Sequence, residues 1–325
     1  MAGLIDIHDH TPRGQIEFRY CLGDLCLFRI RFHGCIARQT FDPAAAPLTR
    51  PFENPEIPKD VDLVLYGGRH ITERLPTIQP TRRAICYIRN QTVNYYIDLA
   101  GSFDDYLKGF SSKTRSTLQR KLRKITAMAG GTLECRTFRT LDDVKEFHRY
   151  SRQIAVKTYQ ERMFDGAIPA SVEFAERMRG LAQRNCLRAF VLLIKGEPVS
   201  YLYLPASDGA LVYGYLGYDP TYARWSPGTI LLYLALERVF AEQQFRYFNF
   251  THGEGQAKEL FGRARFLQAD VHFFHWTLRN ALAVYGHAGV EWLSSKIGQL
   301  LETVGLRKMM RKLLRHWFGS EAKAA

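Results

Sequence analysis

The order of elements predicted between Thr132 and Trp276 restricts the fold more than any other feature of this chain. Alternating apolar and polar residues predict strands, whereas apolar residues three and four positions apart predict helices. The predicted order is a strand, two helices, three strands, a helix, a strand, a short helix and one or two closing strands. An antiparallel meander followed by a β-α-β crossover predicts a mixed sheet with helices on both faces.

Local signals support the middle of this order. Arg188–Ile194 and Pro198–Leu204 flank Lys195-Gly196-Glu197, which predicts a tight hairpin. Ser171 can accept hydrogen bonds from the free amides that begin the second helix. The string Ser226-Pro227-Gly228-Thr229 opens the next helix, because proline has the backbone angle of a first helical turn.

The remaining chain is predicted to form three further parts. The first hundred residues are β-rich and contain a hairpin around Leu22-Gly23-Asp24. A basic helix follows, capped by Ser111 or Ser112 and ended by Gly130-Gly131. The end of the chain is helical and basic. The predicted divisions are residues 1–100, 101–131, 132–277 and 278–325.

The formal net charge of +13 favours acidic partners, which include nucleic acid, anionic lipid and phosphate-bearing small molecules. No acid occurs between Asp105 and Glu134, where seven lysines and arginines lie. The stretch from Leu306 to Phe318 is predicted to be a basic amphipathic helix, either at an anionic membrane surface or packed on the protein. No recognisable module predicts sequence-specific DNA binding.

Several features bear on the cellular compartment. The segment Met1–His10 has no basic, apolar leader, so we expect no signal peptide. No run of about 18 apolar residues predicts a bilayer crossing. The six cysteines form no C-x-x-C pair, which favours a reduced cytoplasm and argues against a structural zinc site. The expected location is cytoplasmic, with peripheral contact at the inner face of the membrane through the basic tail.

Three passages resemble GNAT acetyltransferases, in particular the CelD-type branch associated with cellulose and exopolysaccharide synthesis, a distant relative of the FemAB peptidyltransferases. They are the basic helix from Ser112 to Arg120, the hairpin Leu193–Ser200, and Phe248–Glu254 with Lys258 and Phe261. The last is similar to "F-D-F-x-x-G-x-x-x-x-K-x-x-F". The resemblance implies a GNAT-like α/β fold, with a mostly antiparallel sheet flanked by helices. It also implies that residues 1–100 are a truncated GNAT-like half.

The same resemblance implies an acyltransferase that uses acetyl-CoA or another acyl-CoA, without a metal. The reaction would be direct N- or O-acyl transfer to a saccharide or another precursor of the cell envelope or exopolysaccharide. Ser226, Gly228 and Thr229 would offer helix-start amides to the pyrophosphate, and Arg224 would add charge. The plainer interpretation is a well-capped helix start. Only one glycine of the usual glycine-rich phosphate loop remains.

In this fold the pantetheine arm lies between two strands that part. The resemblance assigns its contacts to Tyr215, Leu216 and Gly217, where a backbone amide would stabilise the developing oxyanion. A half-buried strand with alternating tyrosines would explain the same residues without a cofactor.

Proton transfer requires a group of suitable pKa near the acceptor. Glu254 and His252 follow the strand that ends near Thr251, and Glu254 can alternatively favour the start of the next helix. Lys258 either holds phosphate or substrate or is solvated. His148 is a third candidate, although a lone histidine is more often structural.

The predicted acceptor-facing residues are Lys157 and Tyr159, at the end of the first helix of the catalytic part. Lys113 and Arg115 in the basic helix would bind an anionic saccharide, lipid or RNA, or simply form a solvated face. Two other functions stay open. One is a Fem-like transferase that uses charged tRNA. The other is a non-catalytic GNAT-fold module that binds a membrane or RNA.

Overall fold

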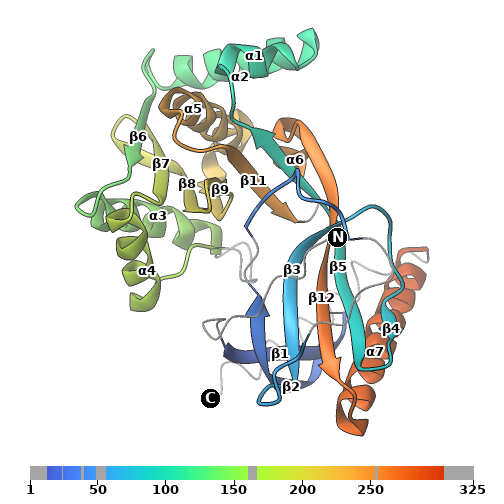
Figure 1. The fold of residues 1–325 in the computed structure, drawn as a ribbon. Helices are drawn as coiled ribbons and strands as arrows, with labels where there is room; N and C mark the ends of the chain where they lie inside the picture. Colours follow the sequence, from blue (N-terminus) through green and yellow to red (C-terminus); the bar gives the residue numbers. More distant parts are fainter. Residues whose placement is uncertain are drawn as a thin grey trace. The chain divides into compact units, whose positions relative to one another are not determined.

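The computed structural model describes residues 13–23, 25–37, 40–48, 56–159, 167–252 and 255–303. The chain divides into two compact units (Figure 1). The first unit contains residues up to Gln39, then 44–91 and Leu267 onward, and the second contains 40–43 and 92–266.

The sheet of the second unit carries the predicted meander and crossover. Its strands lie in the order β11-β9-β8-β7-β6, with the end of β5 (Ala84–Asp98) beside β11 and with β10 paired to β8. All pairs are antiparallel except β9 with β11, which the crossover helix makes parallel. The bounds are β6 Glu134–Phe138, β7 Leu187–Ile194, β8 Glu197–Ser207, β9 Ala210–Val212, β10 Tyr215–Tyr218 and β11 Tyr247–His252.

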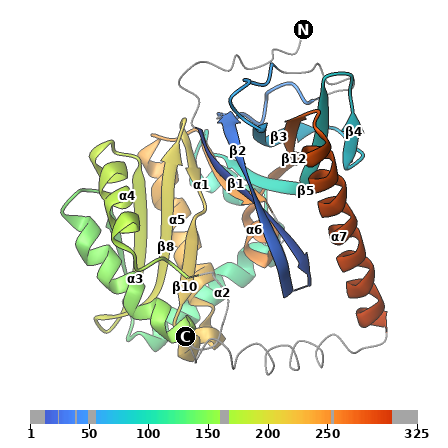
Figure 2. The same cartoon turned by 90° about the horizontal axis from the view of Figure 1, so that it is seen from below.

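Helices cover both faces of this sheet (Figure 2). In β7, Phe190 and Leu192 pack with α5, whereas Ala189 and Val191 pack with α3 and α4. Because both faces are buried, β7 is an almost unbroken apolar run. The helix bounds are α1 Phe103–Lys108, α2 Ser112–Met128, α3 Asp143–Tyr159, α4 Val172–Gln183, the 3-10 helix η1 Pro220–Trp225, α5 Pro227–Glu242 and α6 Gln256–Phe261.

The predicted helix starts are confirmed by their hydrogen bonds. The Ser111 hydroxyl accepts from the Thr114 amide at 3.1 Å, and the Ser171 hydroxyl accepts from the Phe174 amide at 3.3 Å. The Asp143 carboxylate accepts from the amides of Arg139 and Thr140. These contacts satisfy amides that have no acceptor within the helix.

The first unit pairs strands that are far apart in sequence. Its order is β1-β2-β3-β12-β5, with β4 beside β5 and with β2 parallel to β3. The hairpin predicted around Gly23 is confirmed as β1 and β2. The bounds are β1 Arg13–Leu22, β2 Leu25–Ala37, β3 Leu63–Ile71, β4 Ile78–Pro80 and β12 Ala264–His275, followed by helix α7 Leu278–Thr303.

The boundaries of the two compact units therefore differ from the divisions predicted from the sequence. Strand β12 pairs Leu267 with Ile71, which draws residues from both ends of the chain into one unit. Local patterns do not reveal such long-range pairing. The predicted fold class is confirmed: a mixed α/β fold with mostly antiparallel strands, flanked by helices.

Candidate functional site

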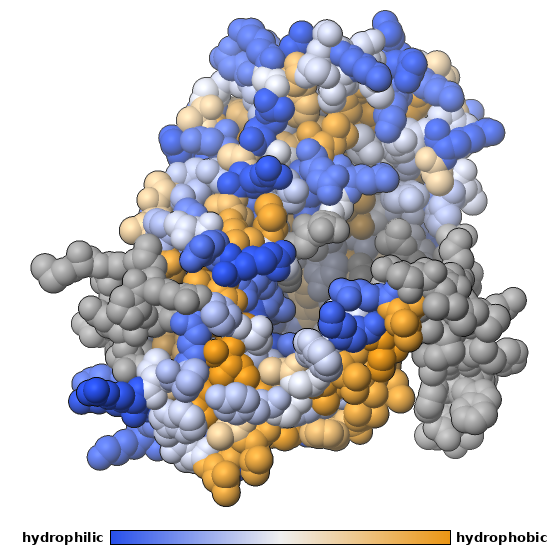
Figure 3. Space-filling model, turned by 90° about the vertical axis from the view of Figure 1, so that its right-hand side faces the viewer, coloured by the Kyte–Doolittle hydropathy of each residue, from blue (hydrophilic) through white to orange (hydrophobic). Residues whose placement is uncertain are grey.

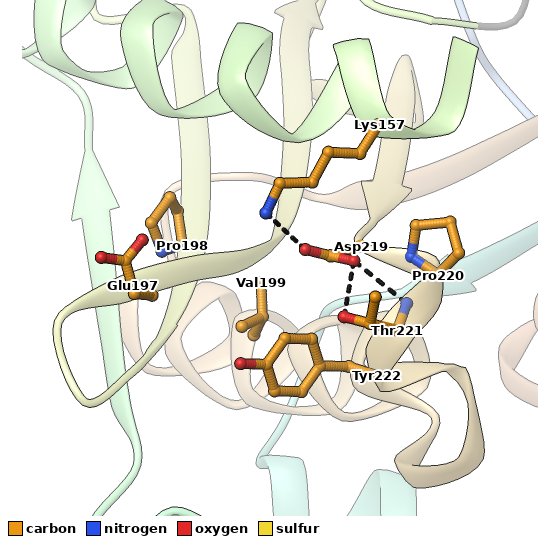
Figure 4. Close-up of a pocket in the computed structure, with 8 residues that line it drawn as sticks. All are labelled: Lys157, Glu197, Pro198, Val199, Asp219, Pro220, Thr221 and Tyr222. Carbon is orange, nitrogen blue, oxygen red and sulfur yellow. Dashed lines mark hydrogen bonds and ion pairs between the residues drawn. The ribbon is translucent and has the colours of Figure 1, made fainter. Parts of the chain in front are cut away.

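A cavity of about 410 Å³ opens in the second unit where α3, the start of β8 and the end of β10 meet. Lys157 reaches it from the last turn of α3, where a positive charge interacts favourably with the helix dipole. Figure 4 shows its ammonium directed at the carboxylate of Asp219. The other lining residues are Glu197, Pro198, Val199, Pro220, Thr221 and Tyr222.

The carboxylate of Asp219 links α3 to η1 at this cavity. Its Oδ2 accepts a hydrogen bond from Lys157 Nζ at 2.5 Å, and its Oδ1 accepts from the Thr221 amide and hydroxyl at 3.0 and 2.8 Å. The side chain of Asp219 is 4% exposed, whereas that of Lys157 is 47% exposed. Burial would raise the pKa of Asp219, but hydrogen bonds from Lys157 and Thr221 outweigh it and lower that pKa. Asp219 is therefore an ionised, paired anchor, and the Lys157 ammonium, which lines the cavity, has further N–H donors besides the one that Asp219 accepts.

The second feature of the site is the separation of β10 from β11. Strand β9 pairs with β11 from Ala210 to Val212, and the Tyr213 amide then donates to the Asn249 carbonyl at 2.8 Å. The next amide, that of Gly214, donates instead to the Tyr203 carbonyl of β8, and β10 then continues along β8. Within the described ranges, no strand pairs with the other edge of β10. The rings of Tyr213 and Phe250 lie 5.6 Å apart where the two strands part.

Helix α5 begins directly beside β10. A Cβ atom on Gly228 would lie 2.8 Å from Leu216 Cδ2, so the glycine permits the close approach of helix and strand. Ser226 has a φ of 55° and gives no side-chain cap to the helix. The first-turn amides of α5 thus lack both an intrahelical acceptor and a serine cap. Thr229 is half-buried in the same turn.

The other predicted cofactor residues divide between the two faces of β10. Leu216 packs in the core with α5, but Tyr215 turns to the opposite face, with its ring 5.8 Å from that of Phe174. Gly217 lies against the ring of Tyr201, and its carbonyl accepts from the Ser200 hydroxyl at 2.9 Å. Arg224 is exposed, with its guanidinium 3.8 Å from the ring centre of Trp225.

Two other predicted catalytic residues, His148 and Lys258, form hydrogen bonds within the second unit. One ring nitrogen of His148 lies 3.1 Å from the Pro169 carbonyl, which links α3 to the loop before α4. Lys258 in α6 donates to the Thr251 hydroxyl at 3.5 Å, and burial lowers its pKa.

The two predicted anion-binding residues of α2 lie in its first turn. Lys113 and Arg115 are both exposed, and Arg115 donates to the carbonyls of Lys108 and Phe110. Helix α2 contacts both η1 and α5.

Several predicted residues lie outside the described part of the structure. Glu254 and the tail Leu306–Phe318 are outside it. The backbone of His252 belongs to β11 and that of Tyr159 to α3, but their side chains are not described. Among the predicted residues, Leu216 and Gly228 lie in contact. Lys157 instead meets Asp219, a partner that the sequence did not suggest.

That partner, Asp219, and the cavity residues Glu197, Thr221 and Tyr222 were missed by the sequence analysis. A local signal for Asp219 exists, because an aspartate directly before a proline caps the helical turn that the proline begins. No local signal predicts that Lys157, 62 positions earlier, would approach it.

Residues 112–259 match the family described as acetyltransferase (GNAT) domain. The second unit has a GNAT-like fold. No curated protein matches the chain significantly.

Solved structures with a similar fold are distant. The C-terminal domain of a putative lysylphosphatidylglycerol synthetase from Agrobacterium fabrum is 11% identical, with a TM-score of 0.43 over 62% of this chain and 65% of that one. L-PGS from Bacillus licheniformis is 14% identical, with a TM-score of 0.40 over 62% and 65%. FemX is 9% identical, with a TM-score of 0.44 over 59% and 63%. The chain thus spans just under two thirds of each of these proteins, and at such values the likeness indicates no substrate.

The described residues contain no group of three or more histidine, cysteine or acidic side chains arranged to hold a metal ion. In the same ranges, no helix combines the length and apolar character needed to cross a bilayer.

Proposed function

We propose that the second unit is an acyltransferase that moves an acyl group directly from a coenzyme A thioester to an amine or hydroxyl of a saccharide or other cell-envelope precursor. The observation that carries this proposal is the parting of β10 from β11 after Asn249, beside the start of α5. The unpaired edge of β10 would face the pantetheine arm and offer backbone groups to the thioester. The uncapped first turn of α5 would receive the pyrophosphate.

The close packing of Gly228 on Leu216 supports this arrangement, because it makes the phosphate seat and the pantetheine strand direct neighbours. A helix start held against the strand that has the unpaired edge would fix both ends of the cofactor arm. Positioning of this kind lowers the entropic cost of bringing the reactants together.

The cavity at Lys157 would hold the acceptor. Its lining combines the Lys157 ammonium, the exposed Glu197 carboxylate and the Tyr222 side chain, which suit a polyhydroxyl or amine-bearing molecule. Asp219 positions the ammonium and, as a paired carboxylate, is not available as the base.

In the reaction, the acceptor nitrogen or oxygen would attack the thioester carbonyl and lose its proton to a base, for which Glu254 and His252 are the candidates. The carbon–sulfur bond would then break, and the coenzyme A thiolate would leave and take up a proton. Lys258 would hold phosphate or substrate, and His148 would hold the loop before α4 in place. The likeness of Leu193–Ser200 and Phe248–Glu254 to the CelD-type branch supports an acceptor from exopolysaccharide or envelope synthesis.

The test is binding of acetyl-CoA, measured by calorimetry and by thermal shift. If it binds the folded state, acetyl-CoA raises the melting temperature by mass action. Thr229→Glu places a carboxylate in the first turn of α5. There the negative charge interacts favourably with the helix dipole but repels a pyrophosphate. We expect acetyl-CoA to bind at least about tenfold more weakly to Thr229→Glu, a difference of about 1.4 kcal/mol, in a protein that is no less stable.

Thr229→Gln is the matched control, since it has the same size without the charge. Near-wild-type binding by the glutamine variant and weak binding by the glutamate variant would support the phosphate seat. Equal affinity of all three proteins for acetyl-CoA, or no binding by the wild type, would contradict it.

A second candidate function, aminoacyl transfer from charged tRNA, is favoured by the basic face of α2. Between Lys113 and Lys124 this helix has six basic side chains and no acid, and none of the six forms an ion pair with a described residue. Its exposed face also lacks large apolar residues, which suits a phosphodiester backbone. A thermal shift with charged tRNA, without one for acetyl-CoA, would favour this second function.

A further inference from the structure

Helix α7 covers the first unit with one face only. Ala283 and Val284 lie in the core beside β1, and the Tyr20 hydroxyl donates to the Ala283 carbonyl at 2.8 Å. The buried ring of His287 lies 5.2 Å from that of Phe18. These contacts fix which side of the helix faces the sheet.

The outward face of α7 is also apolar. Of the fourteen exposed large apolar side chains among the described residues, seven belong to this helix. Leu278 is 78% exposed, Leu282 67% and Trp292 64%. At about 100° per residue, the seven fall within roughly 140° of the helix circumference, opposite the buried residues. They are Leu278, Leu282, Tyr285, Trp292, Leu293, Ile297 and Leu300.

The charges on this face are positive. Lys296 is exposed within the stripe, four residues after Trp292. Glu291 is the acid among the described side chains of α7, and it is turned toward the sheet, where it accepts from Arg89 at 2.6 Å. Figure 3 views the molecule from the side on which α7 lies in Figure 1, and apolar surface gathers in its lower half.

A helix that is apolar on both faces is normally covered on both. We propose that the outward face of α7 docks on an anionic lipid leaflet. A second copy of the chain would also offer apolar surface, but two molecules of net charge +13 repel each other, whereas an anionic leaflet attracts this charge. Tyr285 and Trp292 are residue types that favour the lipid–water interface.

The sequence after α7 supports the same partner. Residues 304–320 contain five lysines and arginines and no acid. Each basic residue close to an anionic leaflet adds attraction, and this attraction combines with burial of the apolar stripe. The proposal concerns the first unit and does not depend on the acyl transfer proposed for the second.

The test is co-sedimentation of the full chain with vesicles of phosphatidylcholine alone, or of phosphatidylcholine with one quarter phosphatidylglycerol. We expect binding to the anionic vesicles that is at least about tenfold weaker for the double variant Leu282→Asp, Trp292→Asp. Val172→Asp is the matched control, because Val172 is 70% exposed and begins α4, where an acid is tolerated. Leu278→Asp, at the most exposed position, provides a second variant if the double variant is poorly folded.

Strong binding to anionic vesicles, weak binding to neutral ones and a loss confined to the α7 variants would support the proposal. Unchanged binding by the α7 variants would overturn it and assign the attraction to charge elsewhere. Failure of the wild type to bind anionic vesicles would also overturn it. So would a wild-type dimer, seen by analytical ultracentrifugation, that the α7 variants abolish.

Discussion

At the scale of single residues, Gly217 illustrates a constraint that only neighbouring side chains create. A Cβ atom at this position would lie 2.4 to 2.8 Å from the ring and hydroxyl of Tyr201. That ring is 1% exposed, and its hydroxyl accepts a hydrogen bond from the Ile168 amide at 3.3 Å, so it has little room to move. The glycine was expected to contact a cofactor, yet it is already required by packing within the protein.

Gly217→Ala should therefore destabilise the protein by about 1 to 3 kcal/mol through overpacking. Gly180→Ala is the control, because the nearest atom to its added Cβ is 4.0 Å away. Replacing glycine by alanine inside α4 should stabilise the helix by about 1 kcal/mol. Urea denaturation of the three proteins measures both effects. If both alanine variants are equally stable, Tyr201 can move and the packing explanation fails.

At the scale of elements, most helices and strands could be predicted because their signals are local. Ser111 and Ser171 cap helices at the predicted places, and the turn at Gly196 joins β7 and β8. The division of the meander into β9 and β10 was not predicted. It depends on the Gly214 amide turning to the Tyr203 carbonyl, a contact between strands that no local pattern encodes.

Helix α2 is an element whose sequence opposes its own stability. Lys113 and Arg115 occupy the positive end of the helix dipole, and Arg120 lies one turn before Lys124, so like charges repel. A helix that keeps such repulsion is a candidate for binding an anion, which would relieve it.

Arg120→Glu should raise the free energy of unfolding by about 0.5 kcal/mol, because a glutamate four residues before Lys124 replaces repulsion with attraction. Arg120→Gln removes only the repulsion and should give a smaller increase. Chemical denaturation at low salt measures both changes, and 0.5 M salt should reduce them by screening. A loss of stability in Arg120→Glu would show that Arg120 has a structural role.

At the scale of the whole molecule, each unit has its own core, and the first one buries ionisable groups. His272 is 4% exposed among the rings of Phe18, Tyr87 and Phe274. Burial, together with the nearby charge of Arg89, lowers its pKa to about 4. Burial and Arg89 also lower the pKa of His287. Both histidines are therefore neutral in the folded protein at pH values where the unfolded chain binds protons.

The folded protein should lose stability as pH falls from about 6.5 toward 4, because the unfolded state takes up protons that the folded state excludes. For His272 the loss is about 3 kcal/mol, given 1.36 kcal/mol per pKa unit. His272→Phe should flatten this part of the curve of unfolding free energy against pH. A variant that keeps the full wild-type slope would exclude His272 as its source.

The sequence by itself determined the elements, most of their ends and the order that predicts a GNAT-like fold, because capping, turn formation and apolar periodicity act over a few residues. It also determined the excess of positive charge. Only the tertiary structure decided that Lys157 meets Asp219, that the strands part at Gly214, and that β12 joins the start of the chain. These are contacts between distant segments, and they depend on how faces pack and strands pair, which local residue patterns do not specify.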